Sequence, residues 1–370
     1  MSSDAQRDRT VRVVDPIADQ RWDTYVDGHP GSGVYHLGAW AEVMRRTYGY
    51  RPRYLALESG GRLAGVLPAF LTRGAIAGKR LRALPLLPVA DPIADDAAGQ
   101  EELLRGACRL AADEGARIFT LHARDDSYAE RMPELRRAPR DPTWILRLPP
   151  SPDELRPMWK KHSRNLHRSI GKADAAGITV REGRGEGDLK AFYGLYLRNM
   201  RRLHAVPKAY RQVALSAKLL EPRGSFKLFV AEYDDRVVAA ITAYRVRDYC
   251  ELLFIGTDEN YLDVRPNHAV YRRAIEWAAE EGMTLVDLGG APAEHSLGKF
   301  KAQWAAEEVP EYRYDHVVAS AGEGAEGSRA DSVRGATEGL GGRRPLVVAA
   351  WSRMPLAATR LAGLVAYRYA

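Results

Sequence analysis

The sequence predicts a mixed α/β fold in which two related domains follow one another along the chain. One order of elements occurs twice: a strand, a turn rich in Gly or Asp, a second strand, a helix that ends at a Gly, and a buried strand. The first copy comprises Leu55–Pro68, Arg105–Gly115 and Ile118–Leu121, and the second comprises Phe229–Ala240, Arg273–Gly282 and Leu285–Leu288. A helix with a basic face is expected before each copy, at Trp40–Arg46 and Leu195–Arg202. With 370 residues, the chain is long enough for two ordinary domains, each with its own core.

The domain boundary is expected at Leu148–Asp153, where three prolines interrupt any strand or helix. We therefore predict a first domain at residues 1–150 and a second at 151–318. Residues 319–344 are rich in Gly, Ala, Ser, Glu and Arg without apolar periodicity, which predicts a flexible linker. Residues 345–370 regain apolar spacing and predict an amphipathic segment that either docks on the globular body or lies on a membrane surface.

The N-terminus contains no apolar stretch of the kind found in signal peptides, and nowhere do 18 or more apolar residues run together. These features predict a cytoplasmic protein. The two cysteines, Cys108 and Cys250, lie inside a helix pattern and a strand pattern, which is typical of reduced, buried thiols. Their number and spacing predict neither a disulfide framework nor a zinc site.

The net charge of +7 is concentrated between Arg156 and Lys172, a stretch that contains Lys161, Arg164 and Arg168 and no acid. A single helix over Leu155–Ala175 is expected, with its apolar side chains on one face and its cations on the others. Two interpretations remain open for this stretch. It is either a solvated basic helix or a face that binds the phosphates of a nucleotide, a lipid pyrophosphate or RNA.

The densest group of candidate catalytic residues lies between Val286 and Trp304. A predicted buried strand containing Asp287 ends in Gly289-Gly290, and a loop leads to Lys299, Phe300 and Lys301. Ligands of α/β sheets gather at such strand ends, which favours a functional site. In the alternative interpretation, Asp287 caps the following turn and the lysines are surface charges.

Asn267 lies at the expected start of the helix that ends at Gly282, after Pro266. It is either the N-cap of this helix or part of an anion site at the helix N-terminus. The sequence contains no P-loop, no dinucleotide-binding glycine fingerprint, no His-Glu-x-x-His and no Gly-x-Ser-x-Gly. Kinase, dehydrogenase, zinc-hydrolase and serine-hydrolase functions are therefore disfavoured.

Taken in order, these motifs resemble the Fem-type aminoacyltransferases across residues 20 to 318. The resemblance rests on Trp40, Tyr48-Gly49-Tyr50, Gly65–Pro68, Leu84-Pro85, Asp91-Pro92, Arg164-Asn165-Leu166, Arg265-Pro266-Asn267, Asp287-Leu-Gly289, Gly298–Lys301, Trp304 and Tyr312-Arg-Tyr314. It implies two tandem GNAT-like domains, each a mixed, mostly antiparallel sheet flanked by helices. The chain departs from the family at Val89-Ala90-Asp91, where better-known members carry paired glycines. It also lacks the coiled-coil arm of some members and the pyrophosphate loop of standard GNAT enzymes.

The resemblance implies transfer of an activated acyl or aminoacyl group to an amine. It places Phe300 and Lys301 at the transfer site and Trp40 and Tyr48 among the residues that bind substrate or donor. Attack on an ester builds negative charge on its carbonyl oxygen, which the Lys301 ammonium would stabilise. The amine must also lose a proton, and Asp287, Glu294 or His295 could accept it.

The leading hypothesis is a cytoplasmic transferase at the inner face of the membrane that acts on a cell-envelope, peptidoglycan-type precursor held between its domains. Its donor would be aminoacyl-tRNA or an acyl thioester, and no tightly bound cofactor or metal is expected. The first alternative is an N-acyltransferase that uses an acyl thioester of CoA or a carrier protein in exopolysaccharide or lipid assembly. The second is a protein that binds an envelope precursor without chemistry. Residues 345–370 would supply any peripheral membrane contact.

Overall fold

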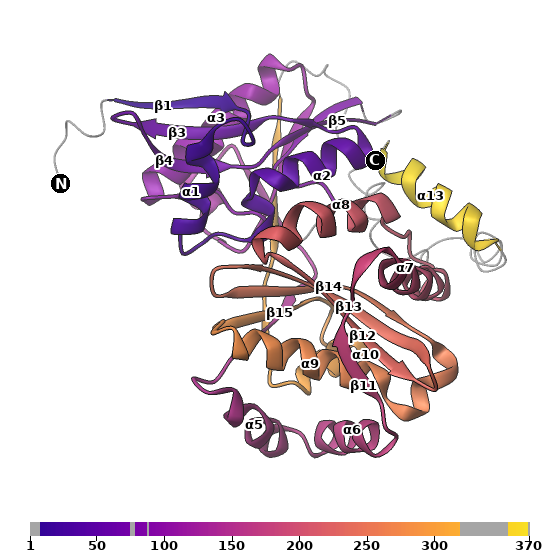
Figure 1. The fold of residues 1–370 in the computed structure, drawn as a ribbon. Coiled ribbons are helices and arrows are strands. Elements are labelled where there is room, and N and C mark those ends of the chain that lie inside the picture. Colours follow the sequence, from indigo (N-terminus) through magenta and orange to yellow (C-terminus); the bar gives the residue numbers. More distant parts are fainter. Residues whose placement is uncertain (1–7, 75–77, 87–88, 319–353, 369–370) are drawn as a thin grey trace. The chain divides into compact units, whose positions relative to one another are not determined.

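The computed structural model describes residues 8–74, 78–86, 89–318 and 354–368 (Figure 1). The predicted linker, 319–344, lies outside the described residues, as does the part of the predicted C-terminal segment before residue 354. The chain divides into two compact units. Unit 1 contains the described residues up to Arg140 and strand β17 (Tyr312–Val317), and unit 2 contains Asp141–Val309.

The predicted domain boundary at residue 150 assigns two strands to the wrong unit. Strand β10 (Thr143–Arg147) belongs to the sheet of unit 2, and β17, expected in the second domain, belongs to a sheet of unit 1. The side chains explain the placement of β10, because Leu146 is buried in the core of unit 2 and the Trp144 indole donates to the backbone oxygen of Ala291. The prolines of Leu148–Asp153 thus mark a loop inside unit 2 and not the domain boundary.

Unit 1 contains a four-stranded sheet in the order β1-β3-β4-β7 and a six-stranded sheet in the order β2-β5-β6-β8-β17-β9. Its strands are β1 (Arg9–Val14), β2 (Arg51–Pro52), β3 (Tyr54–Ser59), β4 (Arg62–Leu67), β5 (Phe70–Gly74), β6 (Gly78–Arg82), β7 (Ile93–Ala94), β8 (Ile118–Ala123), β9 (Arg136–Pro139) and β17. Its helices are α1 (Gln20–Gly28), the 3-10 helix η1 (Val34–His36), α2 (Gly38–Tyr48), α3 (Ala97–Asp113) and α4 (Tyr128–Arg131). Strands β6 and β8 pair in parallel, and the other described pairings are antiparallel.

Local sequence signals account for several element ends in unit 1. The β3–β4 hairpin turns at Gly60-Gly61, where φ values of 54° and 76° favour glycine. Helix α3 begins after Asp96, whose carboxylate accepts a hydrogen bond from the Gly99 N–H at 2.7 Å. It ends before Gly115, which adopts a φ of 63°. The turn at Gly60-Gly61 and the helix end at Gly115 lie in the first copy of the repeat and were visible in the sequence.

Unit 2 contains a seven-stranded sheet in the order β11-β12-β13-β14-β15-β10-β16. Its strands are β10, β11 (Thr179–Glu182), β12 (Phe226–Tyr233), β13 (Arg236–Val246), β14 (Tyr249–Thr257), β15 (Leu285–Gly290) and β16 (Glu307–Val309). Its helices are η2 (Pro152–Glu154), α5 (Leu155–His162), α6 (Arg164–Ala175), α7 (Gly185–Arg202), α8 (Tyr210–Leu220), η3 (Glu221–Arg223), η4 (Glu259–Val264), α9 (Pro266–Glu280) and α10 (Ser296–Ala302). Only β14 and β15 pair in parallel among the described strands of this sheet.

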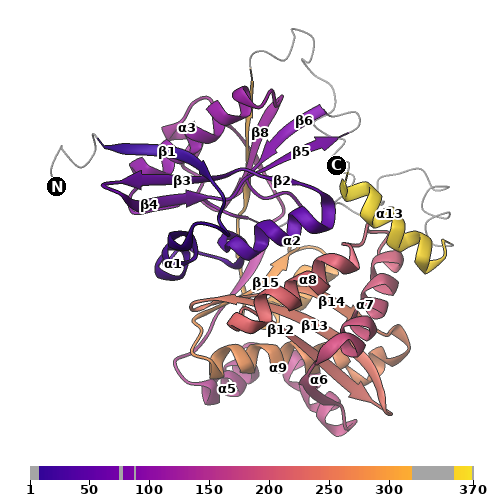
Figure 2. The same cartoon turned by 45° about the horizontal axis from the view of Figure 1, so that its top comes forward.

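Helices α7 and α8 cover one face of this sheet and α6 and α9 cover the other (Figures 1 and 2). Cys250 and Leu252 of β14 pack in the core with α9, whereas Phe254 contacts Tyr196 of α7, with ring centroids 5.6 Å apart. A β-bulge causes this switch of face, because Ala243 pairs with Leu252 but Ile241 pairs with Ile255. The extra Phe254 N–H donates to the hydroxyl of Thr242. The bulge therefore redirects the second half of β14.

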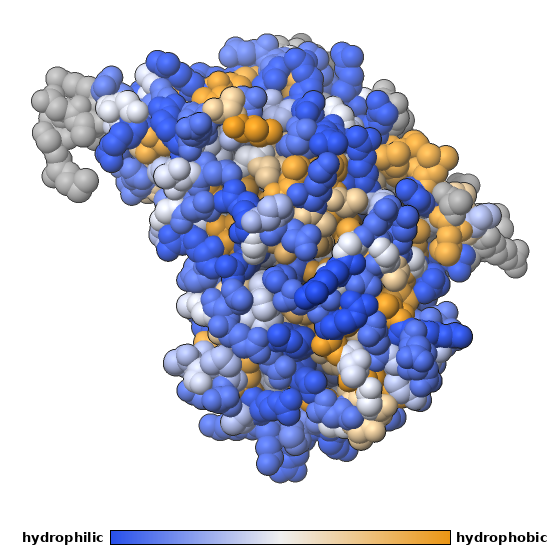
Figure 3. Space-filling model, in the orientation of Figure 1, coloured by the Kyte–Doolittle hydropathy of each residue, from blue (hydrophilic) through white to orange (hydrophobic). Residues whose placement is uncertain are grey.

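The C-terminal helix α13 (Leu356–Arg368) includes part of the predicted amphipathic segment. It packs on unit 2 through Gly363, where an added Cβ would lie 2.3 Å from the backbone oxygen of Pro207. Leu361 and Val365 stay exposed, and hydrophobic surface is visible over this helix in Figure 3. Among the described helices, none has both the length and the apolar character that crossing a bilayer requires.

Candidate active site

The parallel strands of unit 2 separate toward their carboxyl ends. They pair at Tyr249 with Leu285, at Cys250 with Val286 and at Glu251 with Asp287, and the described ladder ends there. Strand β14 nevertheless continues to Thr257, and β15 continues to Gly290. The bulge at Phe254 lies in the part of β14 that pairs with β13 but no longer with β15. Diverging parallel strands expose backbone donors and acceptors, so this edge of the sheet is the candidate active site.

Asp287 is fully buried and accepts three hydrogen bonds. Its Oδ1 accepts from the Thr143 hydroxyl at 2.5 Å and from the Gly289 N–H at 2.7 Å, and its Oδ2 accepts from the Tyr249 hydroxyl at 2.6 Å. Hydrogen bonds of this kind stabilise an ionised carboxylate in a buried place. The bond to Gly289 is the turn-capping contact that the sequence offered as an alternative. Asp287 therefore fixes the end of β15, and its action as a proton acceptor stays a prediction.

Lys301 is also buried, with 3% of its surface exposed, and it reaches the same strand end from α10. Its ammonium donates to the backbone oxygens of Gly289 at 2.7 Å and Gly290 at 3.0 Å. Gly289 is thus held on both sides, since its N–H donates to Asp287 and its oxygen accepts from Lys301. The structure brings Asp287 and Lys301 together through this glycine, which adopts a φ of 82°.

Phe300 and Lys299, the two residues before Lys301, have other surroundings. Phe300 packs edge-on against Tyr271 and His268, with ring centroids 5.1 and 5.2 Å apart. Lys299 is exposed. The surface interpretation therefore fits Lys299, whereas it does not fit Lys301, and a donor-binding role for Phe300 or Lys299 stays a prediction.

Asn267 is not the N-cap of α9. The helix begins at Pro266, and the cap position belongs to Arg265, which adopts a left-handed conformation with a φ of 64°. Asn267 is the second residue of the helix, and its side-chain oxygen accepts a hydrogen bond from the Thr257 hydroxyl. Asn267 therefore ties the end of β14 to the start of α9.

The basic stretch forms two helices, so the expected single helix over 155–175 is wrong. Helix α5 ends at His162 and α6 begins at Arg164. Ser163 separates them in an extended conformation, and its hydroxyl accepts from the Leu166 N–H at 3.2 Å. A serine N-cap of this kind starts a new helix and turns the chain.

Lys161, Arg164 and Arg168 are all exposed on this α5–α6 corner. The corner is attached to the end of α10, because a ring nitrogen of His162 lies 2.9 Å from the backbone oxygen of Ala302. The cations are accessible to an anionic ligand, and they equally fit a solvated surface. Their binding role stays a prediction.

Trp40 and Tyr48 lie in the core of unit 1. Trp40 is fully buried, and its ring contacts Tyr35 edge-on at 5.0 Å. Tyr48 is buried and stacks on Tyr50 at 5.5 Å. Both rings are thus enclosed in unit 1, and their expected role in binding substrate or donor stays a prediction that this burial does not support.

The sequence interpretation missed three residues at the strand ends. Thr143 and Tyr249 hold Asp287, and Glu251 is buried where it pairs with Asp287 across the parallel strands. A charge inside the apolar pattern of β14 could have drawn attention to Glu251, as it did to Asp287. No local signal connects Thr143 with Asp287. Within the described residues, no three His, Cys, Asp or Glu side chains form a candidate metal site.

The candidate site lies within a region that matches a known family. Residues 160–301 match the model of an acetyltransferase (GNAT) domain, and this range includes β14, β15, Asp287 and Lys301. No curated protein matches the chain. The matched range identifies a GNAT acetyltransferase domain in unit 2, which indicates an acyltransferase.

Several solved structures share the fold of the chain. FemX matches with a TM-score of 0.68 at 16% identity, over 84% of this chain and 97% of that chain. L-PGS from Bacillus licheniformis matches with a TM-score of 0.53 at 12% identity, over 81% and 91%. The C-terminal domain of a putative lysylphosphatidylglycerol synthetase from Agrobacterium fabrum matches with a TM-score of 0.51 at 14% identity, over 81% and 92%. These similarities, together with the two mixed, mostly antiparallel units, confirm the predicted fold class of two GNAT-like domains.

Proposed function

We propose that this protein transfers an activated acyl or aminoacyl group to an amine of a cell-envelope precursor, at the carboxyl ends of β14 and β15. The observation that carries the proposal is the separation of these strands beyond Glu251 and Asp287 inside a GNAT domain. The end of β15 is held rigidly there between a buried carboxylate and a buried ammonium. The fold shared with FemX and with a putative lysylphosphatidylglycerol synthetase supports an aminoacyl group.

The chemistry of acyl transfer suits such a strand end. An amine that attacks an ester or thioester carbonyl builds negative charge on the carbonyl oxygen, which preorganised donors stabilise. Beyond Glu251, the backbone of β14 is released from β15 and would offer such donors. Fixing the opposite strand end lowers the cost of orienting the two reactants.

The link between β14 and α9 favours a donor without a pyrophosphate. It consists of Asp258, the 3-10 helix η4 and Arg265, and it carries the carboxylates of Asp258, Glu259 and Asp263. A pyrophosphate at this place would meet like charges. This supports an aminoacyl ester over an acyl-CoA.

Lys301 would act in this reaction as a positioning residue. Its described hydrogen bonds go to the carbonyl oxygens of Gly289 and Gly290, so its ammonium supports the backbone of the strand end. Removing the ammonium would leave the carbonyls of Gly289 and Gly290 without these donors and would loosen the site. A reaction that needs the fixed strand end would then slow down.

The test is a mass-spectrometric transfer assay with the purified full chain and a muramyl-pentapeptide precursor. One set of reactions receives a pool of charged tRNA, and the other receives a panel of acyl-CoA thioesters. We expect an added aminoacyl mass that RNase treatment abolishes. An acyl mass from a thioester alone would assign the protein to thioester-dependent acylation and refute the aminoacyl donor.

Two matched variants connect the activity with the site. Lys301→Met removes the buried ammonium and keeps most of the aliphatic chain, and Lys299→Met makes the same change two residues away at an exposed position. We expect the first to lower turnover at least about 100-fold and the second to leave it within about twofold. Equal activities would exclude the role of Lys301. If the protein bound the precursor but formed no product with any donor, the proposed transferase activity would be refuted.

A further inference from the structure

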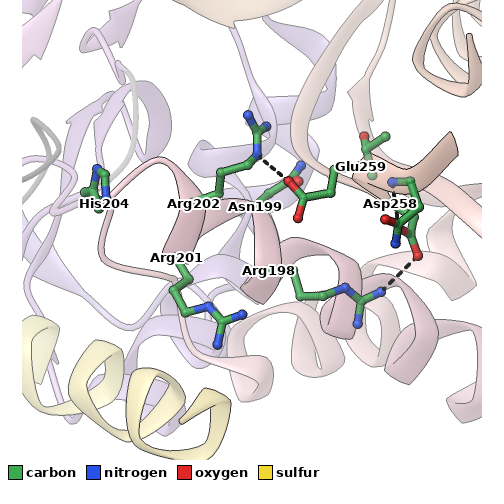
Figure 4. Close-up of a pocket in the computed structure, with 9 residues that line it drawn as sticks. Arg198, Asn199, Arg201, Arg202, His204, Asp258 and Glu259 are labelled. Carbon is green, nitrogen blue, oxygen red and sulfur yellow. Dashed lines mark hydrogen bonds and ion pairs between the residues drawn. The ribbon is translucent and has the colours of Figure 1, made fainter. Parts of the chain in front are cut away.

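Unit 2 contains a pocket of about 350 Å³ between the end of α7 and the start of η4 (Figure 4). We call it the α7–η4 pocket. Its lining residues are Arg198, Asn199, Arg201, Arg202 and His204 from α7 and the chain after it, and Thr257, Asp258, Glu259 and Asn260 from the end of β14 and η4. The volume is within the range of pockets that hold small molecules. None of these residues was a candidate in the sequence.

Opposite charges face each other across this pocket in two long ion pairs. The guanidinium of Arg198 lies 3.9 Å from the Asp258 carboxylate, and that of Arg202 lies 3.9 Å from the Glu259 carboxylate. Figure 4 shows each pair meeting from opposite walls. Some other arginines of unit 2 contact their acids at hydrogen-bond distance, as Arg181 does with Asp188 at 2.6 Å. Both pairs are longer than charge-assisted hydrogen bonds, so a ligand that offers each side chain a shorter contact would replace them.

One acid of the pocket, Asp258, is fixed by hydrogen bonds to Asn260. Asp258 Oδ1 accepts from the backbone N–H and the side-chain amide of Asn260, at 3.1 and 2.9 Å, while Oδ2 faces Arg198. Cations in the last turn of a helix complement its dipole, which accounts for Arg201 and Arg202 by themselves. The helix dipole does not account for two carboxylates held opposite them.

The pocket lies at the strand end that forms the candidate active site. Thr257 lines the pocket and is the last residue of β14, and its hydroxyl donates to Asn267 at the start of α9. The amide of Asn199, in the orientation that satisfies both of its groups, lies 3.1 Å from the backbone oxygen and 3.3 Å from the backbone nitrogen of Thr257. A ligand in the pocket would therefore rest against the carboxyl end of β14.

We propose that the α7–η4 pocket binds a small zwitterion, an amino acid or the end of a short peptide. Its carboxylate would lie on Arg198 and Arg202, and its ammonium would lie on Asp258 and Glu259. A phosphate would meet both carboxylates, and a simple cation would meet the guanidiniums, so neither fits as well as a ligand with both charges. As the acceptor of the transfer, this ligand would present its amine at the end of β14. That last step rests on the proposed function, whereas the binding does not.

The test is a ligand-observed NMR titration of the full chain, without any donor, with the dipeptide alanyl-alanine. Matched ligands are its N-acetyl form, its C-terminal amide and inorganic phosphate. We expect the free dipeptide to bind and each blocked form to bind at least about tenfold more weakly, because each has lost one charge. Phosphate is expected not to displace the dipeptide.

Two variants locate the binding. Arg202→Gln and Glu259→Gln should each weaken binding about tenfold, and Arg211→Gln, an exposed arginine on α8, should leave it unchanged. Equal binding of the blocked forms, displacement by phosphate, absence of dipeptide binding, or indifference to both variants would each overturn the zwitterion site. Dipeptide binding together with no product in the transfer assay would retain the site and refute the proposed function. A transfer product without dipeptide binding would support the proposed function and refute the zwitterion site.

Discussion

Among the described strands, each unit has one parallel pair at the same place in the repeat, and the two pairs end differently. In unit 1 the pair β6–β8 ends with Arg82 opposite Thr120, and in unit 2 the pair β14–β15 ends with Glu251 opposite Asp287. The strands that carry Thr120 and Asp287 both follow a helix that ends at a left-handed glycine. The comparison shows a repeated backbone with different chemistry at the equivalent point.

The hydrogen bonds show what the difference does. Thr120 donates to Asp315 of β17 at 2.8 Å, which links two strands of one sheet. Burial, with Arg80 nearby, lowers the pKa of the Arg82 guanidinium to about 10. In unit 2, by contrast, Asp287 and Lys301 hold a glycine at the strand end. The repeat thus supplies two similar scaffolds, and the candidate active site was built on one of them.

The largest expected difference in stability is between Asp287→Ala and Thr120→Ala. Removing the Asp287 carboxylate leaves two hydroxyls and the Gly289 N–H without their acceptor, which should lower the free energy of unfolding by about 3 kcal/mol. Removing the Thr120 hydroxyl breaks one hydrogen bond and should cost about 1 kcal/mol. Urea unfolding of both variants and the wild type measures this. Equal losses would show that the two strand ends are energetically alike.

The next effect depends on pH and concerns His268 of unit 2. Burial, with a smaller contribution from Arg265, lowers the pKa of His268 from 6.5 to about 4. Between these values the unfolded chain binds a proton that the folded chain does not, so stability falls as the pH drops below about 6.5. His268 should therefore reduce the unfolding free energy by about 2 kcal/mol between pH 7 and pH 5.

His268→Gln isolates this contribution. The substitution itself changes the unfolding free energy at both pH values. The decrease in unfolding free energy between pH 7 and pH 5 should nevertheless be smaller in the variant than in the wild type by about 2 kcal/mol. Urea unfolding at both pH values gives the two differences. An unchanged pH dependence would mean that His268 keeps an ordinary pKa in the folded protein.

A smaller effect separates two glycines with positive φ, Gly289 in unit 2 and Gly115 in unit 1. Alanine at either position should cost about 1 kcal/mol, because their φ values of 82° and 63° are left-handed. Around Gly115 an added Cβ meets nothing within 4 Å, whereas at Gly289 it lies 3.5 Å from the Lys301 ammonium. Thermal melting should therefore show similar losses, while only Gly289→Ala should lower transfer. If both variants transferred equally well, the end of β15 would have no role in the reaction.

The smallest effect concerns the cysteines, one in each unit. Cys108 and Cys250 are both buried, and burial raises the pKa of both thiols, that of Cys108 to about 12. Neither thiol should react with a thiol reagent in the native protein at pH 8. Both should react after denaturation in urea. Rapid reaction of Cys250 in the native protein would show that the core behind β14 opens.

Features that depend on near neighbours in the chain were predictable from the sequence. The two hairpins, the helices that end at Gly115 and Gly282 and the buried strands after them all lie where the repeat placed them. The same repeat predicted two related α/β domains, and the family resemblance implied that they are GNAT-like. Asp287 and Lys301 were selected as a charge in an apolar strand and a lysine beside a strand end. Turn chemistry, capping and periodicity act over a few residues, which is why one sequence reveals them.

The tertiary structure decided what depends on distant residues. Strands β10 and β17 each joined the sheet of the other predicted domain, and Thr143 meets Asp287 across 144 positions of sequence. The facing charges of the α7–η4 pocket come from two segments whose patterns are independent of each other. Which strand pairs with which, and which charges come to face each other, follows from packing of the whole chain. The sequence by itself therefore determined the kind of fold and directed attention to the end of β15, and the structure alone showed how that strand end is held.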